Sequence, residues 1–473
     1  MRVLLIAMPD TVSALDPVVR VPNLGISSIA GNLRNCEVQT IDLAFHNKGI
    51  TQFLSEVIGD LKPDIIGLSA MSFQYESARH VARICRNSSP KSFVALGGYH
   101  ATLMYEEIAG GADAQVFDFL VRGEGEITFR SLVEQLDLPQ PDFAAIPGLS
   151  FRLGDRINHN PPAPLLDLNT LNLPNRDARM VDKSAFMRRP FDCVETSRGC
   201  TMGCKFCSIA QMYGRCIRNF ALERVVDDLK DLKQRGKQGI FFVDDNITLD
   251  IPRLNRLCEM IVQEGLNDLS YVIQASVAGI ASDPELPVRL RKAGFRWIFL
   301  GIESGIGRNM KSMGKQGSLE TTRRAVTSLK RQNIGVFGGF IVGHPDDDAS
   351  DIRATFRYAL DLGVDHPIIQ YLTPYPKTQT REDLMKKGLV INPDDYSRYN
   401  GFSANARTGK LTLGELNHAV FVNGLRLYFN PRYLLRSKFW KYNPRSWPAL
   451  IQNNVRYVAG ARKGQVFPSR HKW

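Results

Sequence analysis

The sequence predicts an α/β protein in which two successive parallel-sheet domains are followed by a mainly helical C-terminal segment. Three observations predict this order. Short apolar stretches alternate with helical stretches over residues 1–140 and again over 189–395, as in parallel sheets covered on both faces by helices. Between them, residues 141–188 are rich in Pro, Asn and Asp, which predicts a linker. The remaining residues, 396–473, are basic and aromatic and predict a separate segment.

The first series predicts a Rossmann-like, doubly wound parallel sheet. Its expected strands are Val3–Met8, Val38–Leu43, Ile65–Ser69, Phe93–Leu96 and, more weakly, Gln115–Val121, with Tyr75–Arg86 as one of the helices. Sheets of this kind bind ligands beyond the carboxyl ends of their strands. The candidate loops are therefore 22–25, 69–72 and 97–100. None contains a G-x-G-x-x-G fingerprint, so the sequence does not support a nicotinamide dinucleotide site.

The second series predicts six strand–helix units. The expected strands are Phe191–Thr196, Gly239–Asp244, Tyr271–Ala275, Trp297–Gly301, Gly335–Val342 and His366–Leu372. The expected helices include Ala221–Gln234, Pro287–Ala293 and Leu319–Gln332. In barrels built from such units the chemistry is located at the carboxyl ends of the strands.

Three cysteines after the first of these strands give the strongest functional signal. Cys200, Cys204 and Cys207 are spaced C-x3-C-x2-C. Thiolates hold iron–sulfur clusters, and three of them on a four-iron cluster leave one iron open to another molecule. An odd number of cysteines fits disulfides poorly, and a structural zinc site usually has four protein ligands. We therefore favour a 4Fe-4S cluster over the disulfide and zinc alternatives.

This cysteine loop, with the aromatic Phe206 before the last cysteine, resembles that of the radical S-adenosylmethionine (SAM) superfamily. The six strand–helix units match the open partial (β/α)6 barrel of those proteins. The resemblance implies that the open iron binds the amino and carboxylate groups of SAM. An electron from the cluster then cleaves SAM to methionine and a 5'-deoxyadenosyl radical, so the three cysteines are the predicted catalytic and metal-binding residues.

The same resemblance implies SAM-binding residues at the ends of later strands. Asp244, in the stretch Phe242–Asn246, is the first choice for the SAM amino group, although these acids also suit a helix cap. Glu303 and Ser304 lie in a Gly-Ile-Glu-Ser-Gly motif that binds the ribose or methionine part of SAM. Ser276, Gly343 and Phe206 complete the predicted SAM set. Tyr371 and Tyr375 are candidates for the substrate cavity, although ordinary aromatic packing explains them as well.

The loops of the first series resemble the cobalamin-binding domain that precedes the barrel in one large radical SAM subgroup. Four pieces match in order, namely Pro22–Ile26, Asp64–Ser69, Leu96–Thr102 and Val121–Glu126. The cobalamin-binding residues implied are Asn23, Leu24, Gly25, Ser69, Ser72, Gly97, Gly98, Gly123 and Glu124. One departure is that Asp42 and His46 are four residues apart, so the D-x-H-x-x-G motif that ligates cobalt is absent. We therefore do not expect His46 to be a cobalt ligand.

Together these features predict a cobalamin-dependent radical SAM C-methyltransferase that moves a methyl group from SAM, by way of methylcobalamin, to an unactivated carbon. Such an enzyme needs an electron donor of the flavodoxin or ferredoxin type. The opening Met8–Thr11 and Arg20–Gly25 resemble hopanoid C-3 methylases, which suggests a lipid substrate. One alternative is a cyclase of the anaerobic magnesium-protoporphyrin type. Another is a non-catalytic cobalamin or cluster sensor that binds nucleic acid.

Basic charge is concentrated at the end of the chain. Residues 416–473 hold 11 Lys and Arg and no Asp or Glu, whereas the whole chain has a net charge of +12. Packing on the barrel, contact with an anionic membrane surface and binding of nucleic acid all fit such a segment, and nucleic acid is the least expected. No apolar run is long enough to span a bilayer, and no secretion signal is evident. The predicted location is the cytoplasm, with peripheral contact to the inner face of the membrane as an option.

Overall fold

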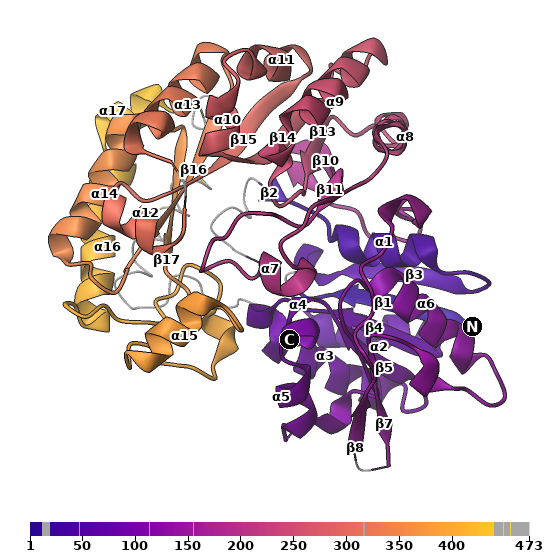
Figure 1. Ribbon diagram of the computed structural model, residues 1–473. Coiled ribbons are helices and arrows are strands. Elements are labelled where there is room, and N and C mark those ends of the chain that lie inside the picture. Colours follow the sequence, from indigo (N-terminus) through magenta and orange to yellow (C-terminus); the bar gives the residue numbers. More distant parts are fainter. Residues whose placement is uncertain are drawn as a thin grey trace. The chain divides into compact units, whose positions relative to one another are not determined.

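The computed structural model describes residues 1–11, 19–46, 48–112, 114–154, 156–315 and 317–438, with the single residues 448, 455 and 473 (Figure 1). These residues belong to two compact units. The first contains Met1–Thr11 and Pro22–Lys183, and the second contains residues 19–21 and the chain from Ser184 onward, except for Trp473, which belongs to the first. The α/β class expected from the sequence is confirmed.

The first unit is built on a sheet with the strand order β3-β1-β4-β5-β6-β7-β8. Five strands are parallel: β1 (Arg2–Ala7), β3 (Glu37–Asp42), β4 (Ile65–Ser69), β5 (Phe93–Gly97) and β6 (Phe119–Val121). The strand order reverses between β1 and β4. Ligands of doubly wound sheets bind beyond the carboxyl ends of the strands at this reversal.

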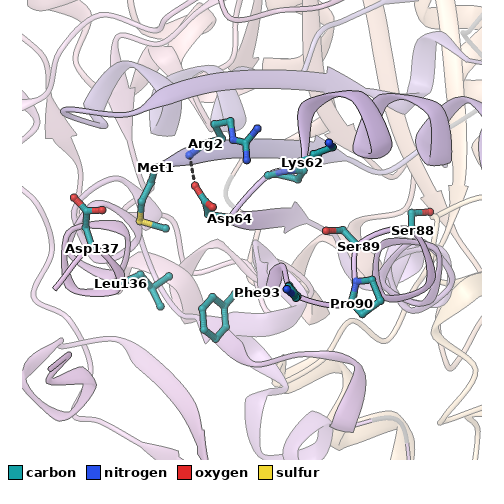
Figure 2. Close-up of a pocket in the computed structure, with 12 residues that line it drawn as sticks. Met1, Arg2, Lys62, Asp64, Ser88, Ser89, Pro90, Phe93, Leu136 and Asp137 are labelled. Carbon is teal, nitrogen blue, oxygen red and sulfur yellow. Dashed lines mark hydrogen bonds between the residues drawn. The ribbon is translucent and has the colours of Figure 1, made fainter. Parts of the chain in front are cut away.

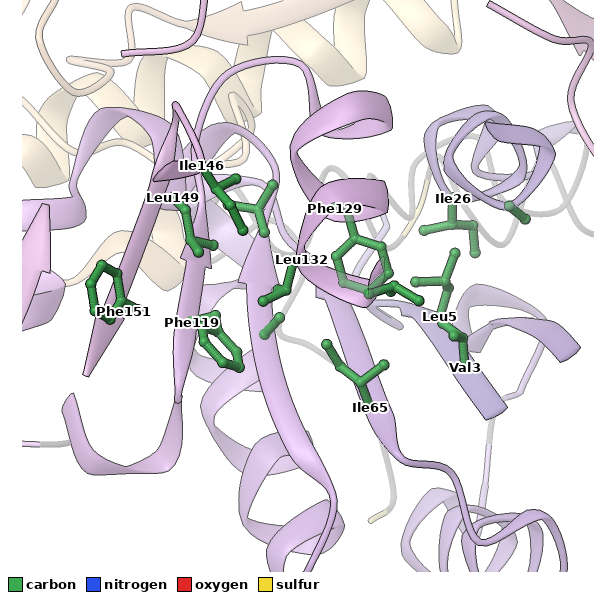
Figure 3. Packing of buried hydrophobic residues seen from close by; sticks show 14 of the residues in the cluster. Val3, Leu5, Ile26, Ile65, Phe119, Phe129, Leu132, Ile146, Leu149 and Phe151 are labelled. Carbon is green, nitrogen blue, oxygen red and sulfur yellow. The ribbon is translucent and has the colours of Figure 1, made fainter. Parts of the chain in front are cut away.

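Helices cover both faces of this sheet. They are α1 (Leu24–Asn32), α2 (Ile50–Leu61), α3 (Tyr75–Ser88), α4 (Tyr99–Leu103), α5 (Tyr105–Gly110) and α6 (Gly125–Leu136). Successive side chains of β1 point to opposite faces, yet Val3, Leu4, Leu5 and Ile6 are all at most 2% exposed. On one face, Val3 and Leu5 join a core with residues of α1, α6 and β6 (Figure 3).

The stretch expected as a linker adds two strands to this sheet. β7 (Leu149–Leu153) pairs antiparallel with β6, and β8 (Arg156–His159) pairs antiparallel with β7. Leu149 and Phe151 are buried in the same core (Figure 3). The Pro- and Asn-rich composition of 141–188 concealed this hairpin, and chain without a regular helix or strand follows it, apart from the short turn Leu168–Thr170.

The second unit contains a curled sheet with the order β17-β16-β15-β14-β13-β10-β9-β2 (Figure 1). Six neighbouring strands are parallel, as the sequence predicts: β10 (Arg189–Val194), β13 (Gly239–Phe242), β14 (Ser270–Ser276), β15 (Phe295–Glu303), β16 (Gly335–Val342) and β17 (His366–Tyr371). β9 (Ala185–Phe186) and β2 (Val19–Arg20) extend it by antiparallel pairing. The open curvature of this sheet confirms the predicted partial barrel.

Helices follow the parallel strands. They are α7 (Ile209–Tyr213), α8 (Leu222–Gln234), α9 (Ile251–Gln263), α10 (Val277–Ser282), α11 (Leu286–Lys292), α12 (Gly307–Ser312), α13 (Leu319–Arg331), α14 (Ala349–Leu362) and α15 (Gln379–Lys386). A short ribbon of β11 (Ser197–Arg198) and β12 (Arg218–Asn219) brackets the cysteine loop.

The described part of the basic C-terminal segment packs on this unit. α16 (Leu413–Tyr428) lies against α14, and α17 (Pro431–Arg436) follows it. Tyr428 and Tyr433 are buried, and the Tyr428 hydroxyl donates to the Pro367 carbonyl oxygen at 2.9 Å. Of the partners expected for this segment, the barrel is the one that the described residues contact. The aromatic and basic stretch 439–442 lies outside the described residues, and so does most of the chain after it.

Two further features of the described residues concern membrane-spanning helices and a cavity in the first unit. Among the described residues, no helix combines the length and apolarity needed to cross a bilayer. A cavity of about 740 Å³ in the first unit lies at the amino ends of β1, β4 and β5, where Arg2, Lys62 and Phe93 are among its lining residues (Figure 2). Ligands of such sheets bind at the opposite edge, so this cavity is not part of the predicted cofactor site.

Candidate active site

The cysteine loop begins six residues after β10 and folds back on itself. Gly199 has φ +89°, and a Cβ atom there would lie 2.5 Å from the Cys216 carbonyl oxygen, so the position requires glycine. The Cys207 amide donates to the Cys204 carbonyl oxygen at 3.2 Å, which closes a turn between two of the cysteines. The loop is held from outside by the Lys205 amide, which donates to the Met313 carbonyl oxygen at 3.0 Å.

The three cysteine thiols are free and partly exposed, as ligands for an added group must be. Burial raises the pKa of each thiol, to about 12 for Cys207, and each of Cys204 and Cys207 also feels the charge of the other cysteines before it in the loop. Within the described residues, no three His, Cys, Asp or Glu side chains are gathered as a metal centre. The fit to an iron–sulfur cluster therefore rests on the soft donor set on one short loop.

Two neighbouring carboxylates follow β13, and their surroundings differ. Asp244 is 1% exposed and accepts hydrogen bonds from Thr196 and Ser197, the residues that lead into the cysteine loop. Asp245 is partly exposed and accepts one from the Gly199 amide at 3.0 Å. Burial raises the pKa of Asp245 to about 6, and the charge of Asp244 adds to the rise.

The end of β15 carries a buried ion pair. Lys315 Nζ lies 2.8 Å from Glu303 Oε1, and the two side chains are 10% and 12% exposed. Burial pulls the pKa of Lys315 down, but the charge and hydrogen bond of Glu303 outweigh it and the net pKa is raised. Glu303 has φ +69°, a left-handed conformation that is rare for a residue with a side chain. Its neighbour Ser304 is 1% exposed, and its hydroxyl oxygen accepts from the Ile306 amide at 3.1 Å.

The other residues predicted to bind SAM lie at the ends of strands or in the cysteine loop. Ser276 caps α10 by accepting from the Gly279 amide at 3.0 Å. Gly343 follows β16 with φ +84°, and a Cβ atom there would lie 3.1 Å from Leu416 of α16. Phe206 packs against the core that contains Met310 and Ile341. Because β14, β15 and β16 are parallel neighbours, their ends bring Ser276, Glu303 and Gly343 to one edge of the sheet.

Of the two tyrosines predicted to line a substrate cavity, Tyr371 is buried and Tyr375 is partly exposed. Tyr371 is 4% exposed and ends β17. Burial raises the pKa of Tyr375 to about 12, its hydroxyl is hydrogen-bonded to Thr373, and it feels the charge of Cys207. Tyr375 is thus close to the cysteine loop, which suits a residue beside the reacting groups as well as one with a packing role.

In the first unit, the predicted cobalamin loops meet after β4 and β5. Gly98 has φ +91°, and a Cβ atom there would lie 2.7 Å from the Ala70 carbonyl oxygen, so only glycine fits. The Ala70 amide donates to the Gly97 carbonyl oxygen at 3.1 Å, which places Ser69 and the two glycines side by side. Ser72 lies 3.2 Å from Nδ1 of His100, whose pKa burial lowers to about 4.

The remaining predicted cobalamin residues occupy two neighbouring turns. Asn23 caps α1, which begins at Leu24 and Gly25, by accepting from the Ile26 amide at 3.1 Å. The Gly123 amide donates to Thr102 Oγ1 at 3.0 Å. Glu124 is 8% exposed, and its carboxylate accepts from the Leu166 amide at 2.9 Å. All of these residues follow or flank the carboxyl ends of β1, β5 and β6.

Three residues of this site, Lys315, Thr196 and Ser197, were not predicted from the sequence. Lys315 sits in a loop after α12, twelve residues beyond Glu303, and no spacing rule indicated that it would reach back to that carboxylate. Thr196 and Ser197 precede the cysteine motif, which begins at Cys200. Asp245 was visible as the second of two adjacent acids, but nothing in the sequence indicated which of the two would face the cysteines.

Two protein-family models match the chain. Residues 194–359 match the Radical SAM superfamily, and residues 13–133 match the B12 binding domain. The first match begins at the end of β10 and includes all three cysteines. The second covers β3, β4, β5 and β6 of the first unit and most of α6, and it begins after β1. The cofactors that the sequence predicts, a 4Fe-4S cluster, SAM and cobalamin, are those of these two domains.

Three relatives align over most of the chain. An uncharacterized methyltransferase of Pyrococcus horikoshii is 29% identical over 444 residues, 93% of this chain and 95% of that protein. The anaerobic magnesium-protoporphyrin IX monomethyl ester cyclase of Cereibacter sphaeroides is 28% identical over 386 residues, 79% of this chain and 61% of the cyclase. The hopanoid C-3 methylase of Methylococcus capsulatus is 25% identical over 367 residues, 76% of this chain and 68% of the methylase.

Solved structures share the fold. The cobalamin-dependent SAM radical enzyme OxsB, with aqua-cobalamin and SAM bound, has a TM-score of 0.71 at 18% identity and covers 97% of this chain and 72% of its own. The radical SAM methyltransferase TsrM from Kitasatospora setae, with cobalamin and a [4Fe-4S] cluster bound, has a TM-score of 0.65 at 19% identity, covering 82% and 75%. The predicted order of the two domains is thus confirmed, because the residues that match the B12 binding domain precede those that match the Radical SAM superfamily.

Proposed function

We propose that the protein is a cobalamin-dependent radical SAM C-methyltransferase. One observation carries the proposal: a single chain joins a B12-binding domain to a radical SAM domain with three cysteines on one loop. The P. horikoshii relative, described as a methyltransferase, supports it over nearly the whole chain. When bound, the cluster supplies the electron that cleaves SAM, and cobalamin carries the methyl group.

The residues of the chain bind and position these groups. Cys200, Cys204 and Cys207 would hold the cluster, with Glu303 and Ser304 beside the methionine or ribose part of SAM. The glycines after β5 allow the close backbone approach that a large flat cofactor needs. Tyr371, buried at the end of β17, and the partly exposed Tyr375 after it would help to exclude water from the reacting carbon.

For the substrate we propose a membrane lipid of the hopanoid class. The identity to hopanoid C-3 methylase supports it, and so does the basic, aromatic sequence after residue 438, which suits an anionic membrane surface. The enzyme would then work at the inner face of the membrane, with a small acidic flavodoxin or ferredoxin as its electron donor.

Anaerobically reconstituted protein tests the reaction. It should cleave SAM to 5'-deoxyadenosine in the presence of a reductant, and Cys204→Ala should abolish that cleavage because it removes a cluster ligand. Methyl-labelled SAM should deliver label to the product. A protein that makes no 5'-deoxyadenosine under these conditions would fit the non-catalytic sensor instead.

The substrate is tested in a strain that makes hopanoids. Mass spectrometry of lipids and pigments should show that deletion of the gene removes a methylated hopanoid that the parent contains. Unchanged hopanoid methylation would disprove the lipid proposal while leaving methyl transfer to another acceptor open.

A cyclase is the second candidate, because magnesium-protoporphyrin cyclases are 28% identical over 386 residues. Such an enzyme uses the same two domains but leaves no methyl group from SAM in its product. Labelled methyl in the product therefore excludes the cyclase, and 5'-deoxyadenosine without product label supports it.

A further inference from the structure

The position of Asp244 follows from the pairing of two neighbouring strands. Val194, the last residue of β10, lies opposite Phe242, the last residue of β13. Thr196 and Asp244 each come two residues later, so the two side chains meet beyond the sheet. The Thr196 amide donates to Asp244 Oδ2 at 3.1 Å, and the Thr196 hydroxyl donates to Oδ1 at 2.6 Å. The Ser197 hydroxyl donates to the same Oδ1 at 2.5 Å.

Because of these contacts, both oxygens of the Asp244 carboxylate accept hydrogen bonds from the protein itself. Asp244 is 1% exposed, and both of its oxygens accept from the two residues that precede the cysteine loop. A buried carboxylate without such donors would be costly, so the three bonds explain why this acid is tolerated in the interior. A ligand ammonium would have to displace them to reach it.

Arg253 of α9 holds the same segment from the other side. Its guanidinium donates to the Thr196 carbonyl oxygen at 3.2 Å and to the Phe220 carbonyl oxygen at 2.5 Å. The Phe220 amide in turn donates to the Thr196 carbonyl at 3.0 Å. The charge of Arg253 also interacts with that of Asp244. Both sides of the Thr196 peptide are therefore fixed before the chain reaches Gly199.

Asp245 has the opposite character. Only its Oδ2 accepts a hydrogen bond within this network, from the Gly199 amide at 3.0 Å. Its side chain is partly exposed, and its charge is felt by Cys200 and by Cys207. The two adjacent acids therefore have different partners, since Asp244 is buried against Thr196 and Ser197 and Asp245 reaches Gly199 at the start of the cysteine loop.

We propose that Asp244 is a positioning residue that anchors Thr196 and Ser197, and through them the cysteine loop, and that Asp245 is the carboxylate available to a bound ligand. The inference rests on the proposed function only in that a cluster and SAM are the cofactors. It revises the prediction from the sequence, which preferred Asp244 for the SAM amino group.

A pair of isosteric variants separates the two roles. Asp244→Asn replaces one of the two accepting oxygens by an NH2 group, which cannot accept the hydrogen bonds that Thr196 and Ser197 donate. Asp245→Asn keeps a carbonyl oxygen for the Gly199 amide but removes the charge. Both are reconstituted anaerobically as full chains, and two quantities are measured: the rate at which an iron chelator removes the cluster, and the dissociation constant for SAM with its effect on the electron paramagnetic resonance spectrum of the reduced cluster.

Asp244→Asn should lose its cluster about tenfold faster than the parent, as for partners that orient metal ligands, with SAM affinity unchanged. Asp245→Asn should keep the parent's cluster lifetime, weaken SAM binding at least about tenfold and remove the spectral effect of SAM. Ser197→Ala, which removes one donor and leaves both acids, should behave like Asp244→Asn and covers the case in which that variant fails to fold.

A cluster lifetime equal to the parent's in Ser197→Ala would overturn the proposal. So would an Asp244→Asn protein whose cluster lifetime equals the parent's and whose SAM binding is weakened, and that result would assign Asp244 as the SAM ligand. Neither measurement involves a methyl acceptor. Failure to find methyl transfer would therefore disprove the proposed function without affecting this result.

Discussion

Lys315 Nζ lies 2.8 Å from Glu303 Oε1, so the two charges at the end of β15 form a buried ion pair beside the cysteine loop. The charge of Lys315 lowers the pKa of Cys204, against the effect of burial, and Glu303 acts in the opposite direction. The pair therefore joins a predicted SAM residue to the predicted cluster site, and its lysine was not expected from the sequence.

Removing the lysine should leave Glu303 buried and unpaired. We expect Lys315→Met to lower the free energy of unfolding by about 3 kcal/mol, because a lone buried charge is costly. Replacing both residues with apolar side chains should restore most of that loss. Chemical denaturation of the reconstituted protein measures both. Lys230→Met is the matched control, since its pair with Glu264 is exposed and should have no measurable effect. Equal effects of Lys315→Met and Lys230→Met would contradict the buried pair.

The turn after β5 should not tolerate a side chain at Gly98. In Gly98→Ala the new Cβ would meet the Ala70 backbone in a left-handed conformation, and we expect a loss of about 2 kcal/mol or more in stability together with weaker cobalamin uptake. Thermal denaturation and cobalamin absorbance measure these effects. Gly59→Ala, in the last turn of α2 with open space around it, should instead gain up to about 1 kcal/mol. If Gly98→Ala had the stability and cobalamin uptake of its parent, the close approach of residue 98 to the Ala70 backbone would be disproved.

Stability should fall as the solution is acidified, because of a buried histidine. His366 Nδ1 lies 3.0 Å from the Tyr433 hydroxyl, and burial lowers the pKa of His366 to about 3. Between the ordinary pKa near 6.5 and this value, the unfolded chain binds a proton that the folded chain does not. The stability is thus full above pH 6.5 and declines below it, by about 2 kcal/mol between pH 7 and 5 for this group. Denaturation at several pH values should show a smaller decline in His366→Gln.

Binding to an anionic membrane surface should depend on the chain after Lys438. The earlier part of the C-terminal segment packs on the barrel, where Tyr428 and Tyr433 are buried, so these two aromatic side chains are not available to a membrane. We expect the full chain to sediment with vesicles rich in anionic lipid, to release them at high salt and to ignore zwitterionic vesicles. A chain ending at residue 438 should bind neither. Equal binding by both chains would place the contact elsewhere.

The parallel strands were predictable because most of them are short apolar runs that alternate with helical stretches, a pattern that indicates the buried strands of a parallel sheet. β16 shows this well, since all eight of its residues are buried and Gly343 ends it. The hairpin of β7 and β8 was not predictable in the same way. Its strands lie among prolines and asparagines, and only tertiary packing of Leu149 and Phe151 selects the extended form.

The candidate site was predictable at the level of loops and not of side chains. The cysteine spacing placed the thiols on one loop, and the fold confirmed which edge of the sheet carries it. Whether Asp244 or Asp245 faces the cysteines depends on the side to which each points after β13. The reach of Lys315 depends on the path of a loop that has no regular pattern. Both are decided by three-dimensional packing.

The pairing of β2 with β9 means that the chain begins in the first unit with β1, contributes residues 19–21 to the second unit and then returns to the first at Pro22. Val19 lies opposite Phe186, so one contact joins residues separated by more than 160 positions, and everything from Pro22 to Lys183 is a loop between two paired strands. Closing a loop of this length costs only about 4–5 kcal/mol in chain entropy, because the cost grows with the logarithm of length. During synthesis, however, residues 19–20 must wait for Ala185 and Phe186 to be made before they can pair. The pairing of β2 in the second sheet therefore cannot form until all of the first sheet, from β1 to β8, has been synthesised.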